Sequence, residues 1–203
     1  MTLSRREVLR QLAVAATSAA AGGFNLEAAR VVHAFAAEER AQAGGYAPRL
    51  LTAHEYATVS RLAELVVPAD AGGGSAGDAG APEFIDLLCS ENERLADIYR
   101  RGVAWVDEEM DRRGGGAFVG ASSGRQTALL DALIDAERAG VAGELDPGVR
   151  FFAWVRRMTV DAYYTSPIGI RDVGYEGNRV ASAYETPPAA VEFIDRLADD
   201  LGL

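Results

Sequence analysis

Hydrophobic residues recur at helical spacing along most of this 203-residue chain. Apolar side chains three and four positions apart line single faces within 52–66, 82–110, 123–134, 148–164 and 187–201. The alternation of apolar and polar residues that is typical of strands is nowhere sustained. The pattern therefore predicts an all-α fold, a compact single-domain helical bundle.

Polar residues at the ends of these segments predict where helices begin. Thr52 and Glu55 have the spacing of a capping box, in which each side chain bonds the backbone N–H of the other residue. Ser123 and Gln126 have the same spacing. Asp146 stands directly before a proline and is predicted to cap the helix that follows it.

Prolines and glycines predict where helices are interrupted. Pro68 is expected to end the first helix, because proline has no N–H to continue it. Segment 71–80 contains five glycines and no hydrophobic residue larger than alanine, which indicates a flexible, solvated loop. Pro82 suits the first turn of the next helix. Within 82–110, a break is expected at either 90–92 or Gly102.

The first 24 residues have the features of an export signal. Ser4-Arg5-Arg6-Glu7-Val8-Leu9-Arg10 matches the twin-arginine pattern, and an uncharged, alanine-rich stretch follows over 12–24. That stretch is too short to span a membrane as an ordinary helix, and its weak hydrophobicity is typical of a twin-arginine leader. Arg5 and Arg6 are therefore predicted to engage the twin-arginine translocase. The alternative is an amphipathic N-terminal helix with an incidental arginine pair.

A division of the chain follows from this leader. Ala34-Phe35-Ala36 fits the small-residue pattern of a cleavage site. The sequence then predicts a leader over 1–36, a linker over 37–51 and a helical domain over 52–203. Alanine-rich sequence produces such matches by chance, so an uncleaved leader is the alternative.

Composition and charge exclude several classes of function. The net charge of −10 repels nucleic acid and anionic lipid, so no nucleic-acid partner is expected. All 20 basic residues are arginine, which leaves no lysine for a Schiff base or a phosphate loop. Cys89 is the only cysteine, which excludes an intrachain disulfide and a cysteine-rich zinc site.

Candidate catalytic and metal-binding residues are few. His54 has no cysteine or second histidine close in sequence and no G-x-S-x-G motif beside it, which disfavours a metal site and a Ser-His-Asp triad. The glycines of 72–77 lack the preceding strand and the GK[ST] ending of a phosphate loop. Cys89 lies in an apolar helix and is expected in the core. The sequence thus predicts no catalytic residue, no metal site and no cofactor in this chain.

Three segments carry a resemblance to a known family. Residues 161–178, Asp-Ala-Tyr-Tyr-Thr-Ser-Pro-Ile-Gly-Ile-Arg-Asp-Val-Gly-Tyr-Glu-Gly-Asn, join an aromatic helix end to a Ser-Pro turn and a Gly-Tyr-x-Gly-Asn loop. Leu-Val-Val-Pro-Ala-Asp at 65–70 and Ala-Gly-Ala-Pro-Glu-Phe-Ile-Asp at 79–86 agree with it. Together they resemble the small subunit (subunit 3, or gamma) of gluconate 2-dehydrogenase-type complexes over about residues 50–180. The glycine-rich loop before Pro82 and the helix after Pro187 depart from the family pattern.

The resemblance implies an accessory subunit that is not an enzyme on its own. In such complexes a large flavoprotein of the glucose-methanol-choline type binds FAD and oxidises a sugar, a sugar acid or a glycoside, as in gluconate 2-dehydrogenase or glucoside 3-dehydrogenase. A c-type cytochrome often receives the electrons. The small subunit carries the leader, binds the folded flavoprotein, takes it through twin-arginine export and stabilises it. The implied location is the periplasm, with membrane association through the complex as an alternative.

Residues of the signature segment are the candidate interface with the large subunit, because tyrosine, tryptophan and arginine dominate interface energetics. The candidates are Tyr163, Tyr164, Pro167, Tyr175 and Asn178. Phe151 and Trp154 fit the core and the interface equally well. An alternative function is an independent periplasmic binding or hydrolytic domain that uses the same export route, in which His54 would act.

Overall fold

The computed structural model describes residues 4–17, 26–70, 73–140, 143–175 and 186–202. These residues form helices and no strand, so the predicted all-α fold is confirmed for the described part of the chain. The elements in chain order are α1 (Arg5–Thr17), α2 (Leu26–Ala43), α3 (Ala53–Val66), α4 (Ala81–Ser90), α5 (Glu93–Arg112), η1 (Phe118–Gly120), α6 (Ser123–Ala139), η2 (Gly143–Leu145), α7 (Asp146–Thr165), α8 (Pro167–Asp172) and α9 (Pro188–Leu201).

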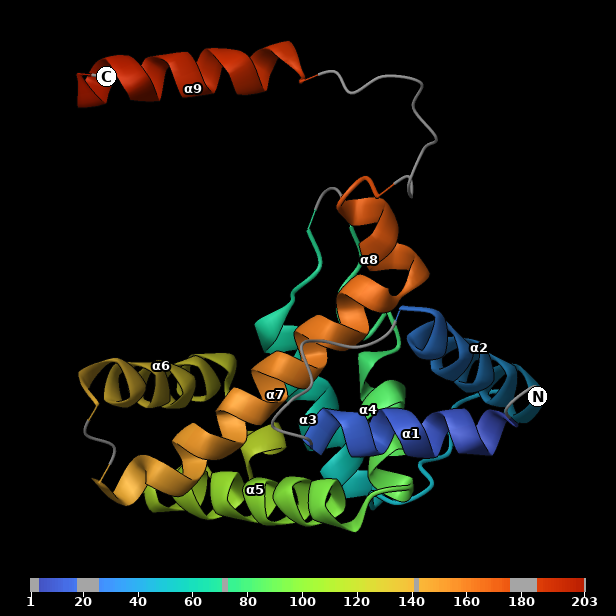
Figure 1. Cartoon of the computed structure of the whole chain (residues 1–203). Helices are drawn as coiled ribbons and strands as arrows, with labels where there is room; N and C mark the ends of the chain where they lie inside the picture. Colours follow the sequence, from blue (N-terminus) through green and yellow to red (C-terminus); the bar gives the residue numbers. More distant parts are fainter. Residues whose placement is uncertain (1–3, 18–25, 71–72, 141–142, 176–185, 203) are drawn as a thin grey trace.

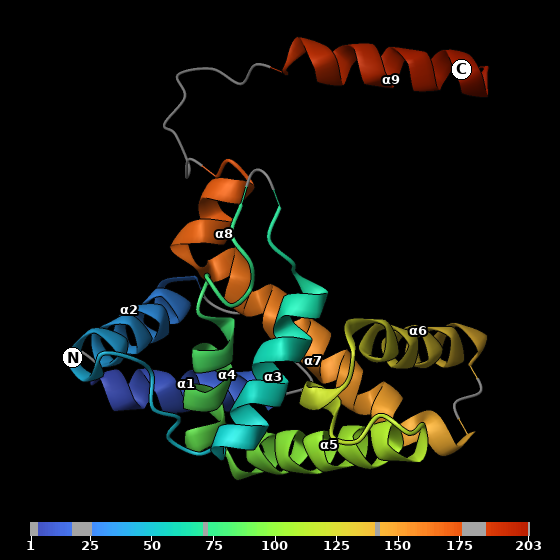
Figure 2. The same ribbon diagram turned by 180° about the vertical axis from the view of Figure 1, so that it is seen from behind.

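Helix α4 lies at the centre of the body and contacts α1, α2, α3, α5 and α7 (Figure 1, Figure 2). Every residue from 81 to 89 is buried, so this helix has no stripe that faces solvent. Phe84, Ile85, Leu87 and Leu88 are completely buried and form the middle of the core. Helices α1, α2, α3, α5 and α7 therefore pack around α4.

A buried carboxylate on α4 fixes the segment that leads into α3. Asp86 is 0% exposed. Its Oδ1 accepts hydrogen bonds from the N–H of Leu50 and Leu51 at 3.1 and 2.9 Å. Its Oδ2 accepts from the N–H of Arg49 at 2.7 Å and from the Tyr46 hydroxyl at 2.8 Å. A buried charge is stable only when it is satisfied in this way, so these bonds hold the incoming chain against α4.

The two N-terminal helices pack against each other and against α4. Leu9 and Ala13 of α1 are 2% and 0% exposed, and the Asn92 side chain donates a hydrogen bond to the carbonyl of Ala13 at 2.6 Å. In α2, Ala36 is 3% exposed. The predicted boundary at residue 36 thus lies inside a helix, and residues 37–43 of the predicted linker are helical. Export and cleavage of this segment stay predictions.

The helix start predicted at Thr52 is confirmed. The Thr52 hydroxyl accepts from the N–H of Glu55 at 3.2 Å, and the Glu55 carboxylate accepts from the N–H of Thr52 at 2.7 Å. Helix α3 ends at Val66, before Pro68, as predicted. Both features depend only on residues close in sequence.

The second capping box, predicted at Ser123 and Gln126, is wrong. Ser122 is the N-cap of α6 and its side chain makes no capping bond. Gln126 is 2% exposed; its amide donates to the carbonyl of Phe118 and accepts from the Arg61 side chain, both at 2.8 Å. A buried amide must be satisfied, and here its partners come from outside the helix.

The cap predicted at Asp146 is also wrong. Asp146 is the first residue of α7, and Leu145 at the N-cap position already has helical angles, φ −82° and ψ −6°. The reason is that η2 leads into α7 without an extended residue between them. The Asp146 carboxylate instead pairs with Arg150 one turn later, at 2.8 Å.

Helices α5 and α7 cross at two glycines. A Cβ on Gly102 of α5 would lie 2.0 Å from the ring of Phe151, and a Cβ on Gly148 of α7 would lie 2.0 Å from the ring of Trp105. Each helix therefore uses a glycine to admit an aromatic ring from the other. The chain breaks between α4 and α5 at 91–92, so α5 runs through Gly102. Phe151 is 3% exposed and belongs to the core.

Helix α9 lies apart from the rest of the described chain (Figure 1). None of its residues is buried. It follows the short helix α8, which packs against the end of α7.

The Gly102 contact predicts the effect of adding one methyl group. We expect Gly102→Ala to lower the free energy of unfolding by about 1–3 kcal/mol, because overpacking against Phe151 outweighs the better helix propensity of alanine. Chemical denaturation monitored by circular dichroism measures this. Gly124→Ala in α6 is the matched control, since nothing lies within 4 Å of its Cβ position, and it should leave stability unchanged or slightly raised. Equal effects of the two substitutions would contradict the crossing geometry.

Candidate partner-binding site

An apolar groove of about 610 Å³ lies between α2, α8 and the turn that precedes α4. Its apolar lining comes from both helices and from that turn. These side chains are Ala34, Ala36, Ala37, Ala79, Pro167, Ile168 and Ile170. We refer to this cavity as the α2–α8 groove.

The α8 wall is built by a tight reversal of the chain after α7. The Ser166 hydroxyl accepts from the N–H of Gly169 at 3.0 Å and donates to the carbonyl of Tyr163 at 2.7 Å. Pro167 occupies the first position of α8, where its missing N–H costs nothing. A Cβ on Gly169 would lie 2.1 Å from the Tyr163 carbonyl oxygen, so this position requires glycine. The Ser-Pro-Ile-Gly stretch at 166–169 therefore fixes the position of α8 at the side of the groove.

The turn before α4 forms the end of the groove. Its structure differs from the flexible, solvated loop that the sequence predicted. The described part of the glycine-rich segment, 73–80, is not a solvated loop. The N–H and hydroxyl of Ser75 donate to the Asp78 carboxylate at 2.8 and 2.9 Å, and these bonds lower the pKa of Asp78. Ala76 is 0% exposed. Gly80 has a φ of 76°, a conformation that glycine adopts without strain, and it begins α4.

His33 attaches the α2 wall to the body. Its ring is 8% exposed and lies 4.9 Å from the ring of Phe84 in α4. Its Nε2 lies 3.2 Å from the Thr165 hydroxyl at the end of α7. Burial lowers the pKa of His33 to about 4, so the ring is neutral at pH 7. The sequence did not indicate this role, because nothing local distinguishes His33 from a leader residue.

Three arginines border the groove, although the protein as a whole is acidic. Arg40 pairs with the buried Glu83 of α4, and Arg30 pairs with Glu27 at 2.9 Å. Arg171 of α8 has no ion pair within the described chain. Asp78 is the one acid among the lining residues. An apolar floor with a cationic border suits an apolar segment flanked by carboxylates.

The predicted interface residues occupy different environments. Pro167 lines the groove. Tyr164 and Tyr175 are 44% and 50% exposed, so both rings are available at the surface. Tyr163 is 2% exposed, and its hydroxyl lies 3.3 Å from the Asp172 carboxylate; it is a buried residue that offers no surface to a partner. Asn178 lies outside the described residues. An interface role stays a prediction for Tyr164, Pro167 and Tyr175, and for Asn178.

The predicted export residues stand at the start of α1. Arg5 is the first residue of this helix, and the side chains of Arg5 and Arg6 lie outside the described part of the structure. Among the described residues, no helix is both long and apolar enough to cross a membrane.

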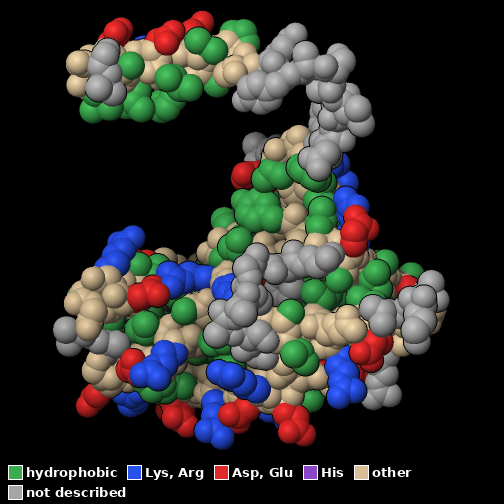
Figure 3. Space-filling model, in the orientation of Figure 1, with side chains coloured by type: hydrophobic (Ala, Val, Ile, Leu, Met, Phe, Trp, Pro, Cys, Tyr) green, Lys and Arg blue, Asp and Glu red, His purple; other side chains and the backbone are tan. Residues whose placement is uncertain are grey.

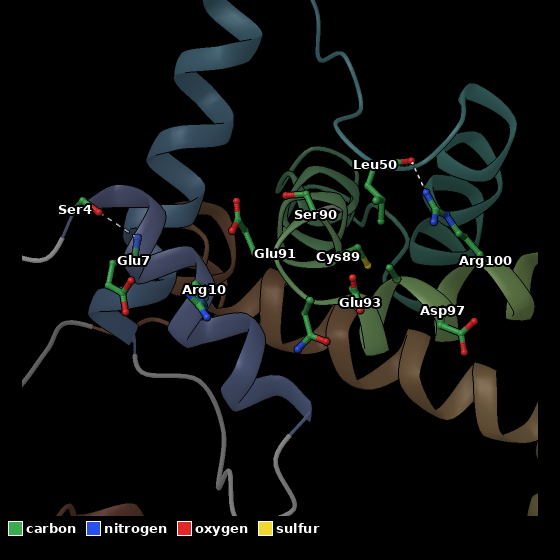
Figure 4. A pocket seen from close by; sticks show the side chains of 12 residues that line it. Ser4, Glu7, Arg10, Leu50, Cys89, Ser90, Glu91, Glu93, Asp97 and Arg100 are labelled. Carbon is green, nitrogen blue, oxygen red and sulfur yellow. Dashed lines mark hydrogen bonds between the residues drawn. The ribbon is translucent and has the colours of Figure 1, made fainter.

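A second cavity of about 1010 Å³ lies between the N-terminus of α1, the end of α4 and the start of α5 (Figure 4). Arg10, Glu91, Asp97 and Arg100 lie around it. Arg100 donates to the carbonyl of Leu50 at 3.4 Å. These charges are of mixed sign and most are exposed, so the cavity resembles a hydrated surface cleft.

His54 of α3 helps to connect α3 with α5 and η1. Its Nε2 lies 2.6 Å from Oδ2 of Asp107 in α5, and Oδ1 of Asp107 accepts from the N–H of Phe118 in η1 at 2.8 Å. No hydroxyl or thiol of the described residues is hydrogen-bonded to His54. Within the same residues, no group of three or more histidine, cysteine or acidic side chains is placed to hold a metal ion.

Comparison with known proteins gives one match. The family model described as Gluconate 2-dehydrogenase subunit 3 matches residues 53–181, which is more than half of the chain. This region includes α8 and the turn before α4, whereas the α2 wall of the groove and helix α9 lie outside it. No curated protein and no solved structure matches the chain.

The burial of His33 predicts a pH dependence of stability. Between pH 6.5 and about 4 the unfolded chain binds a proton at this residue and the folded chain does not, so stability falls as the pH falls through that range. At about 1.4 kcal/mol per pKa unit, the full effect is roughly 3 kcal/mol. The measurement is the unfolding free energy of wild type and His33→Gln from pH 7 to pH 4.

We expect His33→Gln to lose this component of the pH dependence while it keeps a partner for Thr165. His54→Gln is the matched control, because that histidine is exposed. A His54→Gln curve that flattens as much as the His33→Gln curve would contradict the assignment.

Proposed function

The chain belongs to the gluconate 2-dehydrogenase subunit 3 family, and from this membership we propose that it is the non-catalytic small subunit of a periplasmic FAD-dependent dehydrogenase complex. Its partner is a large flavoprotein subunit of the glucose-methanol-choline type that oxidises a sugar or a sugar acid. The small subunit binds this partner, carries it through twin-arginine export and stabilises it.

The observation that carries the proposal is the position of the family's signature residues. Pro167, Ile168 and Ile170 lie in the matched region, yet they line an open groove instead of filling the core. Ser166 and Gly169 hold them there through buried contacts. A rigidly built apolar surface on a subunit marks a place where another protein binds.

The chemistry of the groove suits a long-lived complex. Co-export requires that the two subunits remain together throughout translocation, and slow dissociation depends on a well-packed apolar contact. The α2–α8 groove has an apolar centre and a charged border, which is the anatomy of a specific interface. Tyr164 and Tyr175, in the same signature segment, are further exposed aromatic rings.

The proposed roles of the two subunits account for the use of the twin-arginine route. The twin-arginine translocase accepts folded proteins, and a flavoprotein must fold around FAD before it is exported. On this proposal FAD belongs to the large subunit, and electrons pass from it to an acceptor such as a c-type cytochrome. This chain then contributes the export signal and a surface that binds the large subunit.

The leader also contributes to the groove. Ala36 is nearly buried inside α2, whereas a peptidase needs an exposed, extended segment. Cleavage after Ala36 would remove Arg30, His33 and Ala34 from the groove. We therefore favour the uncleaved alternative, in which the leader remains a part of the folded subunit.

Co-purification tests the proposal. Expressed alone, the chain should show no flavin absorbance and should oxidise no sugar. Expressed with a large flavoprotein subunit of such a complex from the same organism, the chain should co-purify with a yellow, FAD-containing protein. Flavin bound by the isolated chain, or the absence of any flavoprotein in the purified material, would contradict the proposal.

A groove variant links this result to the site. Arg171→Glu reverses a charge that has no ion pair in the described chain, so it should not unfold the subunit, and we expect roughly tenfold weaker binding of the flavoprotein. Arg138→Glu, an exposed position on α6, is the matched control and should bind as wild type does.

A second experiment tests the escort role. Replacing Arg5 and Arg6 by lysine should leave both this subunit and the flavoprotein in the cytoplasm, because the partner has no leader of its own on this proposal. Cell fractionation followed by immunoblotting of both proteins measures it. If the flavoprotein still reaches the periplasm, the escort role is wrong even though the subunit assignment stands.

A further inference from the structure

Helix α1, which carries the predicted export signal, is folded onto the body of the protein. Its apolar face contains Leu9, Leu12 and Ala13, which are 2%, 3% and 0% exposed. These residues belong to the core, and α1 contacts α2, α4 and α5. An export signal acts through its basic residues and through the apolar stretch that follows them. Part of that stretch is therefore covered while α1 is docked.

The attachment of α1 is narrow. Arg10, Gln11 and Val14, on the other side of the helix, are exposed. In the view of Figure 1, α1 crosses the front of the body, and Figure 3 shows arginine and acidic side chains on that face. The cavity of about 1010 Å³ lies between the start of α1, the end of α4 and the start of α5 (Figure 4). An element with few buried side chains can open locally while the rest of the protein stays folded.

Asn92 connects α1 to the start of α5. Its Nδ2 donates a hydrogen bond to the carbonyl of the buried Ala13 at 2.6 Å. Its Oδ1 accepts from the N–H of Leu95 at 3.0 Å and so caps α5. The two polar atoms of one side chain thus have separate partners. A substitution can therefore remove the bond to α1 while the cap of α5 is kept.

We propose that α1 is a latch that covers the apolar part of the export signal in the folded subunit, and that its release from the body limits the rate of export. This inference rests on the proposed function and adds a regulatory step to it. The face that contains Leu9 and Leu12 packs against the body in the docked state and is free for the translocase in the released state. One face cannot make both contacts, so the fraction of chains with α1 released is the fraction ready for export. Asn92 lowers that fraction because it bonds only the docked state.

Hydrogen exchange of the purified full-length chain tests the latch. Asn92→Asp and Asn92→Ser both keep an oxygen that can cap α5, and both lose the amide that bonds Ala13. We expect peptides of α1 to exchange roughly tenfold faster in both variants, because the Ala13 carbonyl loses its donor, while peptides of α7 exchange as in wild type. Ser122→Asp is the matched control. It adds the same charge at the exposed N-cap of α6 and should change neither helix.

Export of the same variants completes the test. With the large subunit co-expressed, pulse-labelling and cell fractionation should show both Asn92 variants reaching the periplasm at least about twofold faster than wild type and Ser122→Asp. Faster exchange of α1 with an unchanged or slower rate of export would overturn the inference. An α1 that is unprotected in wild type, or that exchanges at the wild-type rate in both variants, would also overturn it. Equal acceleration of α1 and α7 would mean that the whole body opens, and no latch exists.

Failure of the proposed function would give different results. If the chain binds no flavoprotein, or if replacement of Arg5 and Arg6 by lysine leaves export unchanged, the proposed function fails whatever the exchange of α1 shows. If those experiments succeed and the Asn92 variants are exported at the wild-type rate, the latch alone is wrong.

Discussion

The carboxylate of Asp86 is the constraint on which the rest of the structure depends. It lies at the centre of a helix without an exposed face, where an unsatisfied charge would cost several kcal/mol. The chain satisfies it with three backbone N–H groups and the Tyr46 hydroxyl, and this fixes how residues 46–51 enter α3. Glu83, one turn earlier on α4, is paired with Arg40 and holds α2 in the same way. Asp86 thus fixes the entry into α3, and Glu83 helps to hold α2, the helix that forms one wall of the groove.

The sequence predicted those features that depend on neighbouring residues. Helical spacing gave the positions of the main helices, and the Thr52 capping box formed because both of its members are local. Predictions failed where a distant contact decided the outcome. Gln126 bonds Phe118 and Arg61 instead of capping a helix. The groove could not be predicted, because its α2 wall comes from segments interpreted as a leader and a linker.

The N-terminal segment with helices α1 and α2 lies outside the region that the family model matches. The family match begins at residue 53, yet α1 and α2 also pack against α4. The predicted export signal and one wall of the candidate binding site are therefore parts of a single folded unit. A subunit of this kind would present its export signal and its binding surface on one folded unit. Helix α9 lies beyond the matched region at the other end of the chain. The central body is thus the family's, and both ends add features to it.

The central claim is that the large subunit binds in the α2–α8 groove, and hydrogen exchange measures this most directly. Peptides that cover 30–40 and 166–175 should exchange more slowly in the purified complex than in the free chain, whereas α6, on another part of the body, should exchange equally in both. Protection confined to α6 or α5, with unchanged exchange around the groove, would contradict the account.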